Sequence, residues 1–275
     1  ANTSGSSNTA AGTNSLIANT TGSDNVAVGR NALDANLTGA SNTAVGRDSL
    51  GANTSASFNS AFGFNALKAN TTGADNTAVG EGVMEVNISG SRNTAMGVSA
   101  LDANTTGADN VALGTYSLST NTTAGKNTAV GRSSLSANIT GAQNVAVGYT
   151  SLEANTTGSN NVAVGYQALD ANTTVSEGTA VGYRALSSNT TGANNTALGT
   201  TAMLDNTTGQ QNVAVGSNAM ANNTTANDNT SVGAYSMNSN TTGTNNIAVG
   251  RNALRLNQSA SDNVAVGRDA LYDNT

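Results

Sequence analysis

The sequence has no cysteine, proline, histidine or tryptophan, and aromatic residues make up only 3% of its 275 residues. Without cysteine there is neither a disulfide framework nor a thiolate metal site. Charged residues are 9% of the chain, against about 25% in an average domain. The chain has ten basic and sixteen acidic residues, so it lacks the excess of basic residues that is typical of a nucleic-acid-binding protein. No run of about 18 apolar residues occurs, and we expect no membrane span in this segment.

Groups that carry catalysis are also scarce. The lack of His and Cys removes the usual general base and nucleophile, and no carboxylate pair recurs at a fixed spacing. The phosphate-binding patterns GxGxxG and GxxxxGK and the calcium pattern GGxGxD are absent. Asp24, Asp34, Asp75, Glu81 and Asp109 stand at variable positions and are interpreted as solvated surface. We therefore expect no enzyme activity, no cofactor and no metal.

The sequence contains instead a strict internal repeat. With the Asn of each NTAVG-like element as position 1, sixteen copies follow one another at a period of 17, the first starting at residue 8, without an insertion. Position 5 is always Gly, position 9 always Leu or Met, and position 12 always Asn. Such a period is typical of stacked structural units. We expect a single array over residues 1–275, and because no capping repeat is visible, a segment of a longer array.

The constraints within one copy predict its local structure. Positions 2 and 4 share one face of a strand and positions 3 and 5, nearly always Ala and Gly, share the other. A second short strand is expected at positions 12 to 14, with a turn at position 15, and the Leu or Met at position 9 is expected inside each coil. Gly, Asn and Thr in every copy oppose a helix. We predict an all-β parallel β-solenoid with one 17-residue coil per repeat.

In such a solenoid, equivalent residues form columns. The predicted structural ladders include Gly29, Gly46, Gly148, Gly165, Leu33, Leu169, Asn36 and Asn172. Tyr149, Tyr166 and Tyr183 occupy position 6 in three successive copies and are expected to form an exposed aromatic strip. That strip is either a surface that holds a sugar ring or a plain packing ladder.

Positions 12 to 14 read Asn-x-Thr/Ser in every full copy, which is the N-glycosylation acceptor pattern. The same pattern is expected if Asn stacks on Asn in a hydrogen-bonded ladder with Thr or Ser beside it. Both interpretations stay open. The candidate glycosylation residues are Asn19, Asn70, Asn104, Asn155, Asn189 and Asn240.

The element N-[TV]-A-V-G-x-x-[AS]-L, seen at residues 161–169, and the stretch GTAVGYRALSSNTTG, residues 178–192, carry a family resemblance. They resemble the heads of YadA-type trimeric autotransporter adhesins, and the NTAVGYQALYSNTTG arrays of phage-tail-fibre-like and bacterial surface proteins. The resemblance implies a left-handed parallel β-roll, three chains packed side by side, and an adhesive role on a cell or virion surface with a cell-surface or glycan ligand. The coils of those heads are usually shorter.

Two interpretations remain open for the oligomeric state, and more than one for the function. The Ala and Gly face at positions 3 and 5 suits close approach by another chain, since a coil of Val, Leu and Ala buries little alone; otherwise Ala and Gly line a thin monomeric solenoid. We predict a structural or adhesive extracellular rod, a homotrimer or higher-order filament. The alternative is an ice-binding solenoid that uses Thr/Asn ladders, although Thr at positions 13 and 14 would point to opposite faces of a strand. A purely mechanical filament is the third possibility.

Overall fold

A computed structural model describes residues 2–274, which divide into two compact units, residues 2–140 and 141–274. Each unit contains eight strands of three residues, one in every 17-residue repeat. The strands of the first unit are β1 Thr9–Ala11, β2 Val26–Val28, β3 Thr43–Val45, β4 Ser60–Phe62, β5 Thr77–Val79, β6 Thr94–Met96, β7 Val111–Leu113 and β8 Thr128–Val130. Those of the second are β9 Val145–Val147, β10 Val162–Val164, β11 Thr179–Val181, β12 Thr196–Leu198, β13 Val213–Val215, β14 Thr230–Val232, β15 Ile247–Val249 and β16 Val264–Val266.

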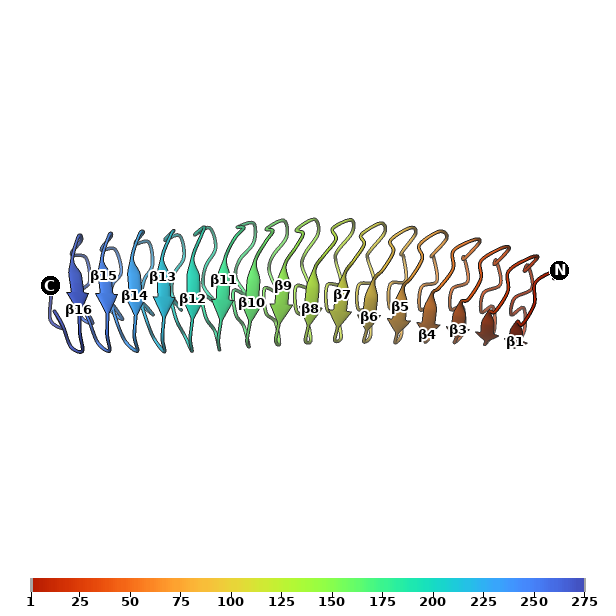
Figure 1. The fold of residues 1–275 in the computed structure, drawn as a ribbon, viewed down its shortest axis with the longest axis horizontal. Coiled ribbons are helices and arrows are strands. Elements are labelled where there is room, and N and C mark those ends of the chain that lie inside the picture. The colour runs from red at the N-terminus through yellow and green to blue at the C-terminus, as the bar shows by residue number, and fades with distance from the viewer. Residues whose placement is uncertain (1, 275) are drawn as a thin grey trace. The chain divides into compact units, whose positions relative to one another are not determined.

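Within each unit every strand pairs in parallel with the next, and the register equals the repeat. Ala27 lies opposite Ala44 in the first unit, and Ala163 lies opposite Ala180 in the second. One strand per coil therefore stands beside its equivalent in the following coil (Figure 1). The predicted all-β parallel β-solenoid with 17-residue coils is confirmed. Over residues 2–274 the structure has no helix of the length and hydropathy that crossing a membrane requires.

The prediction of a second strand at positions 12 to 14 is wrong, because the described coils bend there. The amides of Thr20 and Thr21 both donate to the carbonyl of Leu37, at 2.9 and 3.2 Å. The amide of Asn36 turns back to the carbonyl of Leu33 in its own coil, at 3.2 Å. A parallel ladder needs evenly spaced bonds to successive carbonyls. Two amides that converge on one acceptor bend the chain instead.

The interior of each coil is narrow and built from small residues around one large one. Ala27 at position 3, Ala32 at position 8 and Leu33 at position 9 are all completely buried. Position 9 therefore lies inside the coil, as predicted. The strand alternation places positions 2 and 4 outside, as the half-exposed Val26 and the exposed Val28 show.

This arrangement corrects the expected trimer contact. From β2 on, the central Ala of each strand, or Ser231 in β14, is buried inside its own coil, so it cannot pack against another chain. The alternative, in which these small residues line a thin solenoid, describes the structure. The reason is steric, since a position 3 side chain meets the Leu or Met of position 9 across the coil and has room there for Ala but not for a larger residue.

Each coil also contains three residues in the left-handed conformation, at positions 7, 9 and 17. Asn31, Leu33 and Asp24 have φ values of 57°, 50° and 60°, and their equivalents in the other coils agree with them. This conformation costs about 1–3 kcal/mol for a residue such as Leu. The burial of the Leu side chain, worth about 1.5–3 kcal/mol, offsets that cost. The three sharp turns close the short coil.

Candidate functional site

The Asn that occupies position 12 in every copy of the repeat forms a hydrogen-bonded ladder inside each unit. Asn36 Nδ2 donates to Asn19 Oδ1 at 2.9 Å and to the carbonyl of Gly39 at 3.0 Å. In the second unit, Asn172 Nδ2 donates to Asn155 Oδ1 and to the carbonyl of Val175, both at 3.0 Å. The Asn-on-Asn interpretation of the repeat is thereby confirmed, and each amide ties one coil to its neighbour.

The predicted glycosylation residues belong to this buried ladder. None of the six is more than 2% exposed, and they are Asn19, Asn70, Asn104, Asn155, Asn189 and Asn240. Nδ2 is the atom that would carry a glycan, and in Asn104 it donates to Asn87 Oδ1 at 2.8 Å. This atom is therefore not accessible to modification in the folded coil. Glycosylation stays a prediction, which the intact mass of native material checks.

A second Asn ladder, at position 1, was missed by sequence reasoning. Asn25 Oδ1 accepts from the backbone amide of Asn42 at 3.0 Å, and Asn25 Nδ2 donates to the carbonyl of Gly39 at 2.9 Å. The two ladders thus share the carbonyl of position 15. The signal was present, because position 1 is Asn in every copy except the one that begins at Gly178.

The predicted Gly and Leu ladder residues occupy equivalent places in their coils. Gly29, Gly46, Gly148 and Gly165 follow their strands with φ between 133° and 139°. A Cβ added to Gly29 would lie 2.5 Å from the carbonyl oxygen of Gly46. Leu33 and Leu169 fill the coil interior, at 0% and 1% exposure.

The predicted tyrosine strip is a stack of parallel rings in the second unit. The ring centroids of Tyr149 and Tyr166 are 5.5 Å apart and those of Tyr166 and Tyr183 are 5.4 Å apart. The rings are nearly parallel, at 8° and 11°. Stacking covers both faces of Tyr166, so a sugar ring cannot lie on it. The packing-ladder interpretation accounts for this geometry.

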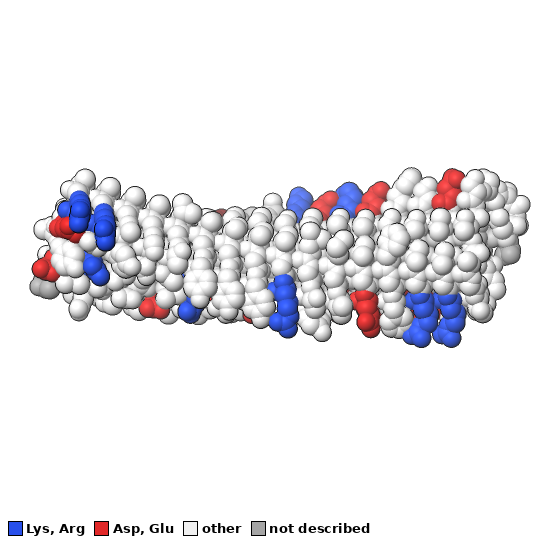
Figure 2. Space-filling view, turned by 90° about the horizontal axis from the view of Figure 1, so that it is seen from below, with Lys and Arg blue, Asp and Glu red and all other residues white. Residues whose placement is uncertain are grey.

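The outward faces of the strands carry two uncharged columns in each unit, formed by positions 2 and 4. Position 2 is Thr, Val, Ser or Ile, and position 4 is Val in most coils. Several large apolar side chains are strongly exposed there, among them Met96 at 51%, Leu198 at 46% and Phe62 at 41%. Charged side chains elsewhere are scattered over a largely uncharged surface (Figure 2). An uncharged surface with exposed large apolar side chains is typical of an interaction face.

The two Thr columns differ in what their hydroxyls do. At position 13 the Thr20 hydroxyl donates to the carbonyl of Leu37 at 2.8 Å, and that of Thr105 to the carbonyl of Thr122 at 3.0 Å. Position 14 is exposed, as at Thr21 and Thr106. The position 13 hydroxyls therefore belong to the scaffold, and position 14 presents its hydroxyls to solvent.

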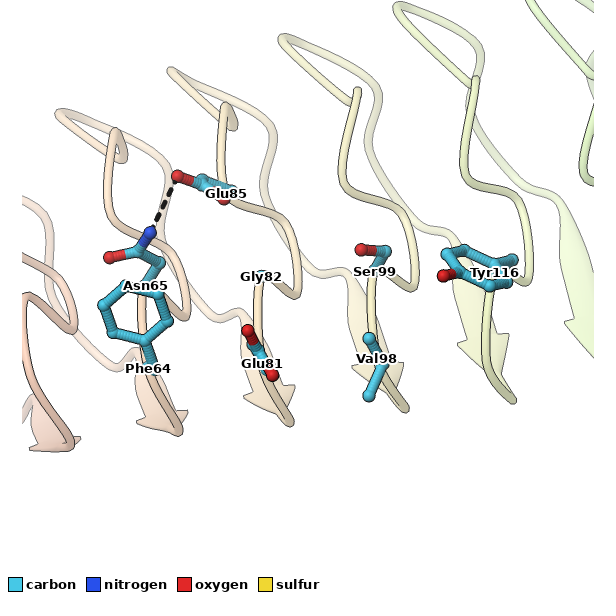
Figure 3. A pocket seen from close by; sticks show the side chains of 8 residues that line it. All are labelled: Phe64, Asn65, Glu81, Gly82, Glu85, Val98, Ser99 and Tyr116. Carbon is cyan, nitrogen blue, oxygen red and sulfur yellow. Dashed lines mark hydrogen bonds between the residues drawn. The ribbon is translucent and has the colours of Figure 1, made fainter.

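A hollow of about 300 Å³ interrupts the surface of the first unit. Its lining comes from four successive coils: Phe64, Asn65, Glu81, Gly82, Glu85, Val98, Ser99 and Tyr116 (Figure 3). Asn65 Nδ2 donates to Glu85 Oε1 at 3.0 Å, and Lys68 Nζ lies 3.8 Å from the same oxygen. The Glu85 carboxylate therefore accepts one hydrogen bond from an amide and lies near one exposed lysine. Glu81, interpreted from the sequence as plain solvated surface, lines the hollow.

The other carboxylates interpreted as solvated surface have different surroundings. The Arg92 guanidinium donates to both carboxylate oxygens of Asp109, at 2.6 and 3.0 Å, and holds the pKa of Asp109 below its usual range. Partial burial raises the pKa of Asp34, and the nearby charge of Asp48 raises it further.

Asp102, beside the hollow, gives a prediction of pH dependence. Partial burial raises its pKa above the usual value, and the Glu85 charge adds to this rise. The Asp102 carboxylate of the native state thus binds a proton at a higher pH than that of the unfolded chain. Its contribution to the free energy of unfolding therefore increases as pH falls from 7 toward the unfolded pKa of about 3.9.

We expect Asp102→Asn to stabilise the protein at pH 7 by up to about 0.5 kcal/mol. Thermal melts at pH 7 and pH 4.5 check this, because the advantage of the variant should shrink at the lower pH; an equal advantage at both would contradict it.

No family model and no curated protein matches this chain. Over residues 2–274 there is no group of three or more His, Cys, Asp or Glu side chains placed to hold a metal ion. The class of protein is set by the fold, a parallel β-solenoid of tandem 17-residue coils tied together by Asn ladders. It is a structural repeat architecture, in which each coil contacts chiefly its neighbours.

Proposed function

We propose that this chain is the shaft or head of an extracellular adhesive fibre, and that three copies pack side by side through the outward faces of their strands. The role is structural and adhesive rather than catalytic. The observation that carries the proposal is the pair of uncharged columns at positions 2 and 4, which leaves Met96 and Leu198 about half exposed in the single chain. The resemblance to YadA-type heads and tail-fibre arrays agrees with this role and with a cell or virion surface as its location.

A second copy is the partner that fits these columns best. Coils stack about 4.8 Å apart, and another copy presents side chains at the same interval over the same number of coils. Burying the exposed part of a Val or Leu contributes about 1 kcal/mol. Repeated over the eight coils of a unit, this gain is about 8 kcal/mol, which is comparable to the cost of association, about 4–15 kcal/mol. The faces carry no charge that would oppose their contact.

The test is the mass of the assembly in solution and its response to one charge. We expect native mass spectrometry to find a trimer, and Leu198→Glu to reduce it to a monomer while circular dichroism stays unchanged, because Leu198 points outward from β12. The matched control is Thr208→Glu, which places the same charge at the exposed position 14 of the same coil. A monomeric parent chain overturns the trimer. A trimer that resists Leu198→Glu shows that another face makes the contact.

Ice binding is the second candidate, favoured by the exposed column of Thr and Ser at position 14. The Asn half of the proposed Thr/Asn ladder is buried, and the position 13 hydroxyls bind carbonyls, so only one of the three columns at positions 12 to 14 is left to meet ice. Ice recognition needs a wider ordered surface than one column of hydroxyls offers. A thermal hysteresis assay separates the two functions, since an adhesive fibre should give none.

A further inference from the structure

The coil of residues 76–92 departs from the repeat at three adjacent positions. Glu81 is an acidic residue at position 6, Gly82 is a glycine at position 7, and Val83 replaces the usual Ala or Ser of position 8. Gly82 has φ 63°, which Asn and Ser adopt at the same position of neighbouring coils. A Cβ at Gly82 would meet only Glu85 Oε2 and Ser99 Oγ, both at 3.6 Å. The backbone therefore does not require glycine here, and the effect of Gly82 is to leave space.

That space is walled by two aromatic rings and two carboxylates. Phe64 stands at one end and Tyr116 at the other, with Glu81 and Glu85 between them (Figure 3). The Arg47 guanidinium of the preceding coil lies over the Phe64 ring, 4.1 Å from its centroid. This ring thus already accepts one cation on a face, as expected from the negative potential of an aromatic face.

The charged groups around the hollow determine whether it attracts a cationic or an anionic ligand. Glu81 and Glu85 line it, and the carboxylate of Asp102 is close enough for the Glu85 charge to act on it. Lys68 pairs with Glu85 on one side, and Arg47 is engaged with Phe64. Three carboxylates against two cations that are already paired leave the hollow negative, which opposes anions and attracts cations.

We propose that this hollow binds a small organic cation, an amine or a quaternary ammonium group. The Glu81 and Glu85 carboxylates are the counter-ions of its ammonium, and the Phe64 and Tyr116 rings stand at the two ends of the hollow (Figure 3). Glu85 already accepts a hydrogen bond from Asn65 Nδ2, which reduces the ordering needed on binding. A volume of about 300 Å³ is at the small end of ligand sites, which limits the ligand to a single amine-bearing sugar ring or a choline-sized group.

The experiment uses the full chain and two related sugars. Glucosamine is a cation at pH 7, whereas N-acetylglucosamine has the same ring without the charge, and choline has the charge without the ring. In calorimetric titrations at low salt we expect glucosamine and choline to bind saturably and N-acetylglucosamine not to bind. Equal binding of the two sugars would show a neutral-sugar site and overturn the cation proposal. Absence of saturable binding by all three would overturn the site.

Two variants and two controls place the ligand in the hollow. Gly82→Asn introduces the residue that position 7 carries at Asn65 and is expected to fill the hollow and abolish binding. Glu81→Gln, a change at an exposed side chain, is expected to weaken binding at least fivefold. Their controls are Ser133→Asn, also at position 7, and Glu153→Gln, at position 10 of the second unit, and neither should change the affinity. Binding that survives both Gly82→Asn and Glu81→Gln would contradict the assignment, whatever the oligomeric state of the chain.

Discussion

Gly114→Ala is expected to lower the free energy of unfolding by about 2–6 kcal/mol. Gly114 has φ 138°, and a Cβ there would lie 2.5 Å from the carbonyl oxygen of Gly131 in the next coil. The strained conformation costs about 1–3 kcal/mol for a residue with a side chain. Forcing the coils apart costs about 1–3 kcal/mol more. Urea unfolding followed by circular dichroism measures the loss.

The coils that Gly114→Ala destabilises are as informative as the size of the stability loss. Gly131 N donates to Leu113 O at 2.7 Å, and this bond joins the two coils that the new methyl group would separate. Because each coil of a solenoid contacts mainly its neighbours, amide exchange should accelerate around β7 and β8 and change little near β2. The control is Gly51→Ala, where the nearest atoms would be 3.4 Å from the added Cβ. Equal stability losses in the two variants would show that stacking does not depend on the position 5 glycine.

The sequence allowed the period, the strand at positions 2 to 4 and the inward Leu to be predicted, because stacking imposes the same constraint on every copy. It did not reveal which face of the strand lies inside. Val26 and Val28 are larger and more apolar than Ala27, and the usual rule would bury them, but the coil has room only for Ala beside Leu33. The left-handed conformation of Leu33 was hidden for a similar reason, since Leu is not a residue that favours it.

The hollow could not be found from the repeat because its lining breaks the repeat. Phe64, Glu81, Ser99 and Tyr116 come from four coils and occupy positions 6 and 7, where almost any residue occurs. Taken singly, each looks like ordinary surface. Only the register that places position 7 of one coil beside position 7 of the next brings them together around Gly82. Departures from an otherwise strict repeat, such as EGVME at residues 81–85, are the signal that could have pointed to it.

Asn104→Asp is expected to be the most damaging of the conservative substitutions at neutral pH. Asn104 is completely buried, and its Nδ2 donates to Asn87 Oδ1 at 2.8 Å and to the carbonyl of Gly107 at 3.0 Å. A carboxylate of the same shape donates nothing, so it would face two acceptors as an unpaired buried charge. Such a charge costs about 3–5 kcal/mol. Asn104→Ala leaves Asn87 Oδ1 and one N–H of Asn121 without partners, at about 1–3 kcal/mol each.

The pH dependence separates the charge from the lost hydrogen bonds. Burial would raise the native pKa of the introduced Asp above its unfolded value of about 3.9, so the native state binds the proton more tightly. The destabilisation should therefore be complete above the raised native pKa and diminish as pH falls toward 3.9, where the protonated acid can donate one of the two original bonds. Asn104→Ala should show no such recovery of stability at low pH relative to the parent chain.

Asn222→Asp, the same change at an exposed side chain, is the control, and its free energy of unfolding should stay within about 0.5 kcal/mol of the parent at every pH. If Asn104→Asp instead matches Asn222→Asp in urea unfolding at pH 7, the amide ladder does not hold the coils together.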